Sequence, residues 1–491
     1  MSSKASSLAR PECLFIDGHW VEPSSSRQIH VLNSSTEEPY LSVAEASEAD
    51  VHEAVAAARR AFDDGPWPLM SHKERAAFLM AISEELSLRA GDIANSWTIE
   101  SGITHKISEP LSKTVGPIYA YYAAMAETFP FVEEKQTTTG KGAGYLVREP
   151  VGVVAAIIPW NGPPLILNYK VAPALLAGCT MVIKPAPEAP SAAYILAEVC
   201  EKVGLPQGVI NVLTAEREVS ESLVRNPGVD KVTFTGSTVA GRRIASICGD
   251  RVARCTLELG GKSAGIVCED YDVETAAKAI AGKALFLTGQ VCASLTRIIV
   301  PKKRHDALVS ALCAEFSNVS VGDPFDAAID MGPLAMKRQL ERVEGYIAKG
   351  KDEGAQLATG GGRPSHLNRG YFIEPTVFGN VSNQSTIAQE EIFGPVLSII
   401  PAEDEDEAVR IANDSIYGLN SAVFTNDADR AYAIARRLRS GTVGHNEYRT
   451  DWRIAFGGFK QSGIGREGGE EGLFPFLETK TVLLDAAAAN A

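Results

Sequence analysis

The sequence contains no apolar run of about 18 residues, the length that a helix needs to cross a lipid bilayer. We therefore expect no association with a membrane. The polar, serine-rich segment from Met1 to Cys13 also lacks the apolar stretch of a secretory signal. Together these absences predict a cytoplasmic protein.

Basic residues are too few to suit a polyanionic partner. The 47 lysines and arginines are outnumbered by 61 aspartates and glutamates, which gives a formal net charge of −14. Such a surface repels phosphate backbones, so no nucleic-acid partner is expected. An anionic cofactor would have to be held by local features, such as a helix N-terminus or a single lysine.

Cysteine patterns that bind metals are also missing. The eight cysteines form no Cys-x-x-Cys pair, and their spacing to the eight histidines matches no metal site. The pattern predicts reduced thiols, as in a cytoplasm, and no bound metal.

What the chain does contain is an alternation of apolar strands and helical stretches. After an irregular N-terminal arm and helices at residues 51–62 and 73–88, an apolar run at 153–158 begins the alternation. This order predicts a parallel sheet with right-handed crossovers, a doubly wound α/β unit. Further strands are predicted at 180–183, 209–213, 231–234 and 254–259, and helices at 165–176 and 191–203.

A second alternating block runs from Asp272 to about Arg439. The sequence thus predicts an α/β protein with two doubly wound domains. The tail from Lys480 to Leu484 is strand-like and could extend another sheet, either in this subunit or in a partner. In the second block, helices are predicted at 273–285, 305–316, 405–413 and 428–438, and strands at 296–300, 396–400 and 422–424.

The segment Lys231-Val-Thr-Phe-Thr-Gly-Ser-Thr-Val-Ala-Gly241 places a strand end against a helix start. Free backbone N–H groups at Gly236 and Ser237 and the positive helix end could bind a pyrophosphate. Gly241 would let the helix pack closely on the sheet. The spacing differs from the Gly-x-Gly-x-x-Gly fingerprint, so an ordinary strand-to-helix turn is an equal alternative.

Two other strand ends carry charged candidates. Lys184 stands where open α/β sheets bind ligands and could contact a ribose or a phosphate; the alternative is a surface lysine before a proline turn. Glu258 ends an apolar strand, where burial would raise its pKa and suit it to act as a general base. The alternative is a carboxylate that points to solvent.

Cys292 lies in a turn of small residues, Thr288-Gly-Gln-Val-Cys-Ala-Ser294, after a helical stretch. A thiol in such a turn can be exposed and activated, whereas a buried and inert cysteine is the alternative. The local sequence favours Cys292 only slightly over the other seven cysteines.

In order and spacing, these four segments resemble motifs of the aldehyde dehydrogenase superfamily, in its NAD(P)-dependent, hydrolytic form. The resemblance extends from about Phe15 to Val482. Three further segments carry it: Pro159-Trp-Asn161, Glu390-Glu-Ile-Phe-Gly-Pro395 and Phe456-Gly-Gly-Phe-Lys-Gln-Ser-Gly463.

The resemblance implies roles for single residues. Cys292 matches the nucleophile, Glu258 the general base, and Asn161 the amide of the oxyanion hole, while Lys170 and Glu467 match residues sometimes assigned to a proton relay. The implied cofactor contacts are Ile158, Pro159, Trp160, Lys184 at the adenosine ribose, Gly236, Ser237 at the pyrophosphate, Gly260, Glu391 at the nicotinamide ribose, and Phe393 beside the nicotinamide ring. The implied substrate pocket contains Leu165, Tyr169, Tyr448, Arg449 and Trp452.

These roles combine into one reaction. The Cys292 thiolate attacks an aldehyde, and Asn161 with the Cys292 backbone N–H stabilises the oxyanion. Hydride leaves to the nicotinamide, and water activated by Glu258 hydrolyses the resulting thioester to a carboxylic acid.

Two segments leave the specificity open. Pro187 stands where many relatives have a glutamate that binds the adenosine ribose, so NADP remains open beside the favoured NAD. The loop from Gly444 to Arg453 contains two arginines, Arg449 and Arg453. Either arginine could hold a substrate carboxylate, or both could pair with Asp451 and surface acids. The apolar and aromatic residues of the implied pocket suit a hydrophobic aldehyde.

The resemblance also implies a homodimer or homotetramer and leaves two other functions to test. A coenzyme-A-acylating semialdehyde dehydrogenase would often lack Glu258, and a non-catalytic scaffold would have lost Cys292 or Glu258. The implied domains are a Rossmann-like cofactor domain at 1–131 and 152–259, a catalytic domain at 260–453, a return to the cofactor domain at 454–469, and an oligomerisation arm at 132–151 and 470–491.

Overall fold

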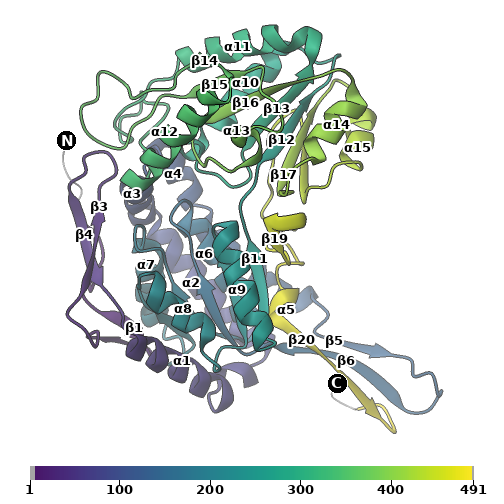
Figure 1. Cartoon of the computed structure of the whole chain (residues 1–491). Helices are drawn as coiled ribbons and strands as arrows, with labels where there is room; N and C mark the ends of the chain where they lie inside the picture. Colours follow the sequence, from purple (N-terminus) through teal and green to yellow (C-terminus); the bar gives the residue numbers. More distant parts are fainter. Residues whose placement is uncertain (1–5, 489–491) are drawn as a thin grey trace.

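Strand β7 (Val153–Ile157) is buried along its whole length, which explains why its sequence is continuously apolar rather than alternating. It lies inside an eight-stranded sheet in the computed structural model, which describes residues 6–488 (Figure 1). From β7 the chain adds two strands on one side and then two on the other. The order is β19 (Gly463–Ile464), β11 (Arg254–Glu258), β10 (Lys231–Thr235), β7, β8 (Thr180–Lys184), β9 (Ile210–Val212), β1 (Leu14–Ile16) and β2 (His19–Val21).

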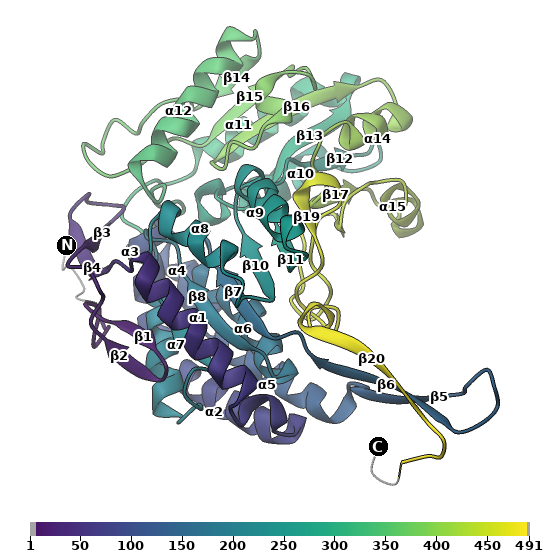
Figure 2. The same cartoon turned by 60° about the horizontal axis from the view of Figure 1, so that its bottom comes forward.

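Helices cover both faces of this first sheet and bury two separate apolar cores. One face packs against α1 (Glu48–Asp63), α8 (Arg217–Arg225) and α9 (Thr238–Asp250), as Figure 2 shows. A capping box, in which Ser47 and Asp50 bond each other's backbone N–H, starts α1. The other side holds α2 (His72–Leu88), α3 (Ala90–Ser101), α4 (His105–Ser112), α5 (Val115–Thr128), α6 (Pro163–Ala177) and α7 (Ser191–Lys202).

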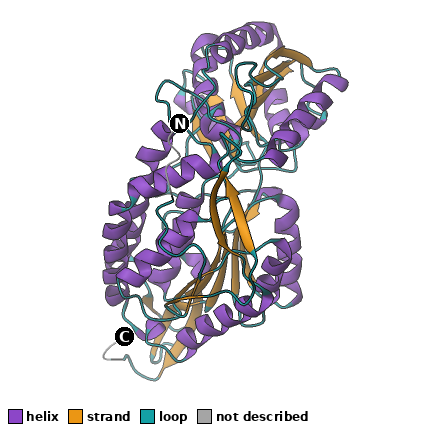
Figure 3. Ribbon diagram, turned by 90° about the vertical axis from the view of Figure 1, so that its left-hand side faces the viewer, coloured by secondary structure: helices purple, strands orange, loops and turns teal. Residues whose placement is uncertain are grey.

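The second sheet has seven strands and forms a separate lobe, which Figure 3 shows above the first. Its core is again split between the two faces, one under α10 (Val273–Ala284) and α11 (His305–Ser317). The other face lies under α12 (Lys337–Asp352), α13 (Thr386–Gln389), α14 (Glu405–Asn413) and α15 (Ala428–Ala435). The strand order is β14 (Gln356–Thr359), β15 (Thr376–Gly379), β16 (Val396–Ala402), β13 (Leu295–Pro301), β12 (Ser263–Val267), β17 (Asn420–Phe424) and β18 (Thr442–His445).

A third, three-stranded sheet projects from the first lobe as an arm (Figure 2). It consists of β5 (Val132–Lys135), β6 (Ala143–Pro150) and β20 (Leu477–Leu484). The pairing of β20 with β6 is antiparallel over eight residues. The predicted tail strand therefore extends a sheet of its own subunit, and β20 forms one edge of it.

The predicted order of strands and helices is confirmed from residue 153 onward, with ends that shift by a few residues. The prediction of an irregular N-terminal arm was wrong. The chain forms the hairpin of β1 and β2 there, followed by β3 (Gln28–Leu32) and β4 (Pro39–Ala44). The β1–β2 hairpin turns at Asp17 and Gly18, whose positive φ values of 54° and 76° match a sequence signal for a tight turn. Within residues 6–488, no helix is long and apolar enough to cross a membrane.

Candidate active site

The candidate residues gather where two sheet edges meet. In the first sheet, β7 and β10 are neighbours. The chain leaves β7 toward β8 on one side and leaves β10 toward β11 on the other. This reversal of direction creates the switch point where open α/β sheets bind ligands. In the second sheet, the segments that enter β12, β13 and β16 hold the other candidates. The carboxyl edge of the first sheet carries Ile158, Pro159, Trp160, Asn161, Lys184, Gly236, Ser237 and Glu258, and the amino edge of the second carries Gly260, Cys292, Glu391 and Phe393.

Two glycines allow these segments to approach each other. The backbone N–H of Gly261 donates to Oε1 of Glu391 at 3.0 Å. A side chain at Gly260 would overlap the Glu391 carboxylate, and one at Gly261 would overlap the carbonyl oxygen of Cys292. Because these two glycines have no side chain, the segments that carry Cys292 and Glu391 can both pack closely against residues 260–261.

Asn161 is held beside the cysteine loop by two hydrogen bonds. Its Nδ2 donates to the carbonyl oxygen of Gln290 at 2.9 Å, and its own carbonyl accepts from the indole of Trp97 at 2.9 Å. The second N–H of the amide remains available for a ligand. Trp97 and Gln290 had no assigned role in the sequence, although Gln290 lies inside the motif around Cys292.

Cys292 is partly buried in a loop whose backbone is strained just upstream. Leu287 and Thr288 both have positive φ values, 52° and 56°, which non-glycine residues rarely adopt. Burial, together with the carboxylates of Glu391 and Glu258, raises the pKa of the Cys292 thiol to about 12. Without ligand, this thiol is therefore protonated near neutral pH, and its activation needs a change of environment or a base.

Glu258 is buried, with 3% of its surface exposed, so the solvent-facing alternative is wrong. Neither carboxylate oxygen has a hydrogen-bond partner among the described residues. Burial and the nearby Glu467 carboxylate raise its pKa well above the usual value. A buried carboxylate without partners can take a proton from a water molecule that enters the site.

A buried ion pair lies behind Glu258. The Lys170 ammonium contacts Oε1 of Glu467 and also donates to the Thr233 hydroxyl at 3.3 Å. Lys170 is fully buried, and Glu467 is nearly so. Both residues therefore lie near the general-base candidate.

The edge after β10 offers the N-terminus of a thirteen-residue helix, α9. Ser237 is exposed there and caps the helix by accepting from the Ala240 N–H at 3.3 Å. A side chain at Gly241 would overlap Leu259, so the predicted close packing of helix on sheet is present. The prediction of a free N–H at Gly236 was wrong, because this N–H donates to the carbonyl oxygen of Glu258 at 3.0 Å. The N-terminal turn of α9, with its positive helix end, still suits a pyrophosphate.

Lys184 is buried at the end of β8, so the surface-lysine alternative is wrong. Burial lowers the pKa of its ammonium to about 8. On the other side of the site, the rings of Trp160 and Phe393 stack edge to face at 5.3 Å. One helix N-terminus and one buried cation at the edge of the first sheet, and the partly buried Glu391 carboxylate at the facing edge of the second, fit the phosphates and riboses of a dinucleotide.

The implied substrate residues come from α6 and from the loop after β18. Leu165 and Tyr169 lie on α6 and are partly buried, as are Tyr448 and Trp452 in the loop. Burial, and then the nearby Cys292 and Tyr169 side chains, raise the pKa of the Tyr448 hydroxyl, so these three side chains lie near one another. Leu165, Tyr169 and Trp452 pack against the apolar core of the first lobe.

The two arginines of this loop already have partners. Arg449 is exposed and pairs with Glu447 at 2.8 Å. The guanidinium of Arg453 lies over the rings of Trp452 and Tyr121, 5.0 and 5.8 Å from their centroids. This arrangement favours the alternative in which neither arginine holds a substrate carboxylate.

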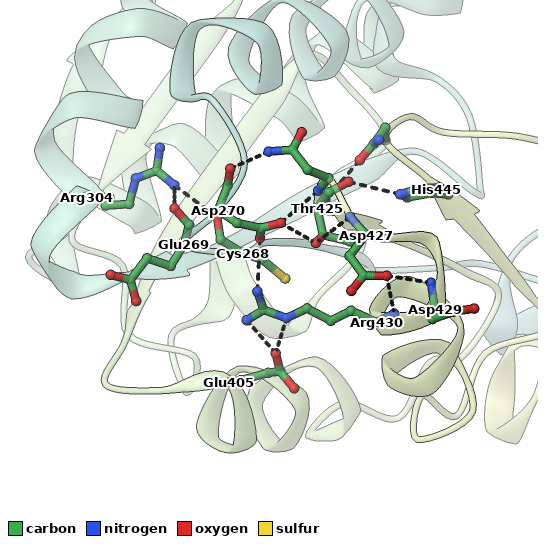
Figure 4. Close-up of polar contacts among 12 residues, drawn as sticks. Cys268, Glu269, Asp270, Arg304, Glu405, Thr425, Asp427, Asp429, Arg430 and His445 are labelled. Atoms are coloured by element: carbon green, nitrogen blue, oxygen red, sulfur yellow. Dashed lines mark hydrogen bonds and ion pairs between the residues drawn. The ribbon is translucent and has the colours of Figure 1, made fainter.

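A cavity of about 490 Å3 lies elsewhere, at the carboxyl edge of the second sheet. Arg430 pairs there with Asp270 at 3.0 Å and with Glu405 at 2.8 Å, and Asp270 accepts from the Thr425 hydroxyl at 2.7 Å (Figure 4). These bonds tie together the loops after β12, β16 and β17. Because Cys292 precedes β13 at the opposite edge, we assign this cavity no part in the reaction.

Comparison with known proteins points to one family. A sequence model described as the aldehyde dehydrogenase family matches residues 20–482. Geranial dehydrogenase of Castellaniella defragrans is 45% identical over 96% of this chain and 98% of its own. The crystal structure of Mycobacterium tuberculosis aldehyde dehydrogenase complexed with NAD+ is 45% identical, with a TM-score of 0.95 over 98% of this chain and 99% of that one. A betaine aldehyde dehydrogenase from Staphylococcus aureus in complex with NAD+ is 35% identical, with a TM-score of 0.95 over 98% of this chain and 96% of that one.

Proposed function

The chain belongs to the aldehyde dehydrogenase family and oxidises an aldehyde with NAD, and we propose that Cys292, Asn161 and Glu258 carry out this reaction. The observation that supports the proposal most strongly is the convergence of the three residues from separate elements. Asn161 bonds the loop of Cys292, and the carboxylate of Glu258 raises the pKa of the thiol.

In the proposed reaction, the Cys292 thiol gives up its proton to a base, and the sulfur forms a bond to the carbonyl carbon of the aldehyde while the electron pair of the C=O double bond moves to the oxygen. The free N–H of the Asn161 amide and the backbone N–H of Cys292 donate to the oxygen that becomes negative. When bound, NAD supplies the acceptor for the hydride that leaves the same carbon. Glu258 then takes a proton from water, which cleaves the thioester on Cys292 and releases the carboxylic acid.

We propose cofactor contacts along the same sheet edges. The backbone N–H of Ser237 and the N-terminal turn of α9 face the pyrophosphate, Gly236 lies beside it, and Lys184 donates to the adenosine ribose. Glu391 accepts from the nicotinamide ribose, where its bond to Gly261 holds it in place. The remaining proposed contacts are Ile158, Pro159, Trp160, Gly260 and Phe393.

We propose an apolar aldehyde as substrate. Leu165, Tyr169, Tyr448 and Trp452 offer apolar and aromatic surface, and Arg449 is engaged by Glu447. A named relative that acts on geranial, at 45% identity, supports the same class. The presence of Glu258 favours hydrolysis over transfer of the acyl group to coenzyme A.

The proposed organisation is a cytoplasmic homo-oligomer, either a dimer or a tetramer. The projecting arm and the edge strand β20 support assembly through residues 132–151 and 470–491. Eight cysteines without a disulfide among the described residues support a reducing compartment. We assign cofactor binding to residues 1–131, 152–259 and 454–469, and the nucleophile's domain to 260–453.

The test is NADH formation by the purified protein with short aliphatic, long-chain, aromatic and carboxylate-bearing aldehydes. NAD and NADP are assayed separately, each with and without coenzyme A. We expect reduction of NAD by apolar aldehydes without coenzyme A. Cys292→Ala should abolish turnover and leave NAD binding nearly intact; retained turnover would contradict the nucleophile assignment, and a strict need for coenzyme A would contradict hydrolysis.

A further inference from the structure

A second, smaller cavity lies at the amino edge of the second sheet, behind the segment that contacts Cys292. Its volume is about 10 Å3, room for a single water molecule or a small ion. Lys262 lines it directly before β12, and Asn420 lines it at the start of β17. The cavity is thus part of the fold's interior and separate from the residues assigned to catalysis.

Three residues that line this cavity each carry a buried polar group without a partner in the described part of the chain. The groups are Nζ of Lys262, Oγ of Ser263 and Nδ2 of Asn420. Their residues are 1%, 4% and 1% exposed. Because a buried polar group without a partner costs free energy, the three point to an occupant that the protein itself does not supply.

The orientation of the Asn420 amide is fixed. Its Oδ1 accepts from the backbone N–H of Ser421 at 2.7 Å, so the NH2 group is the end left without a partner. The Lys262 ammonium can only donate. Two groups of the cavity are therefore obligate donors, and the Ser263 hydroxyl can donate as well.

The charge of the lining has one sign. Lys262, Arg297 and Arg439 line the cavity, and none of the described residues lining it is acidic. The Arg297 guanidinium donates to neutral oxygens, including the carbonyl of Lys262 at 3.0 Å, so its charge is not cancelled by contact with an acid. Burial, followed by the like charge of Arg297, lowers the pKa of Lys262 to about 7, and the Glu391 and Glu390 carboxylates offset this only in part. An anion in the cavity would remove this unfavourable interaction.

We propose that Lys262, Asn420 and Ser263 bind one small monovalent inorganic anion of halide size, such as chloride. Three donors and three nearby cations match an acceptor-only, negatively charged ligand better than water. The small volume favours a single-atom ion over sulfate or phosphate. Since Lys262 follows Gly261, whose N–H holds Glu391, the anion stabilises the same edge that carries the candidate active site.

The first experiment measures the thermal midpoint of unfolding at constant ionic strength while chloride or bromide replaces gluconate. The wild-type protein should gain about 2–5 °C in a saturable manner, and sulfate should not reproduce the saturation. Lys262→Met should lose the response. Lys302→Met, which removes an exposed lysine at the opposite edge, should keep it.

A second variant protects the test against a failure of Lys262→Met to fold. Asn420→Asp keeps the acceptor for Ser421 and places a carboxylate where the orphan NH2 stood, next to Lys262. This variant should fold, match or exceed the wild-type midpoint in gluconate, and no longer respond to chloride. A full chloride response in Asn420→Asp would overturn the proposal.

Diffraction locates the ion directly. Crystals soaked in bromide should give an anomalous peak between Nζ of Lys262 and Nδ2 of Asn420. Ordinary water density with no anomalous signal at this position, together with a non-saturable salt response, would assign the cavity to water and refute the anion site.

Discussion

At the scale of single residues, burial sets the chemistry of the candidate site more than residue type does. Glu258, Glu391 and Cys292 all have raised pKa values, and desolvation is the largest cause for each. Since the charged form is disfavoured, the free protein holds a protonated thiol beside carboxyl groups that readily accept or keep a proton. The site is thus quiescent until ligands change its environment.

The role of Glu258 can be tested by separating the two halves of the reaction. Glu258→Gln should retain the first burst of NADH and slow steady-state turnover by about 100-fold or more, because only thioester hydrolysis needs the base. Rapid-mixing absorbance at the nicotinamide band measures both phases. A lost burst with normal later steps would contradict the assignment.

The carboxylate of Glu391 should control the reactivity of Cys292 above neutral pH. Glu391 has a pKa raised to about 7, so it is charged above pH 7 and then raises the pKa of the thiol. In Glu391→Gln the thiol pKa should fall, and alkylation of Cys292 by iodoacetamide at pH 8–9, followed by mass spectrometry, should be several-fold faster.

Below pH 7 the wild type and Glu391→Gln should react alike, because Glu391 is then neutral. In Glu391→Gln the rate should rise about tenfold per pH unit below the thiol pKa, whereas the wild-type rate should rise less steeply around pH 7, where Glu391 ionises. The exposed neighbour gives the matched control, and Glu390→Gln should behave as wild type. Equal rates for Glu391→Gln and wild type at pH 9 would show that the carboxylate does not act on the thiol.

At the scale of elements, helix α9 shows how packing positions a ligand site. The helix lies on β11, and the absent side chain at Gly241 allows its approach to Leu259. Leu259 directly follows Glu258, so this one contact connects the proposed pyrophosphate seat with the proposed base.

A side chain at this contact should weaken cofactor binding. Gly241→Val should displace α9 from the sheet and raise the dissociation constant for NADH about tenfold or more, measured by fluorescence titration. On the same helix, nothing lies within 4 Å of a side chain placed at Gly249. Gly249→Ala should therefore bind NADH normally, and equal effects of both substitutions would refute the packing argument.

At the scale of the whole molecule, the arm leaves an apolar side chain and the backbone of an edge strand without a covering element from the described chain. Leu483 on β20 is 71% exposed, and β20 is an edge strand in this chain. An exposed, apolar sheet edge favours pairing with another chain.

The assembly proposal predicts a change of mass. Leu483→Glu should shift the protein to a smaller oligomer in light scattering after size-exclusion chromatography. Leu69, on the 3-10 helix Trp67–Leu69, is 87% exposed and belongs to none of the three strands of the arm. Leu69→Glu should leave the mass unchanged, and an unchanged mass for Leu483→Glu would exclude β20 from the interface.

The sequence by itself determined the local structure and the inventory of chemistry. Continuous apolar runs such as Val153–Ile157 predict strands covered on both faces, because burial of both faces removes the need for alternation. The resemblance named Cys292, Glu258 and Asn161. The β1–β2 hairpin was missed although Asp17 and Gly18 marked its turn.

Only the tertiary structure decided the environments, since these depend on contacts between distant segments. Glu391 meets Gly261 across 130 positions, and its carboxylate adds to burial, the larger cause, in raising the pKa of Cys292. Lys262 and Asn420 become a pair of orphan donors only when β12 and β17 lie side by side. Burial and neighbouring charge depend on which segments pack together in the folded chain, so they cannot be predicted from the order of the residues alone.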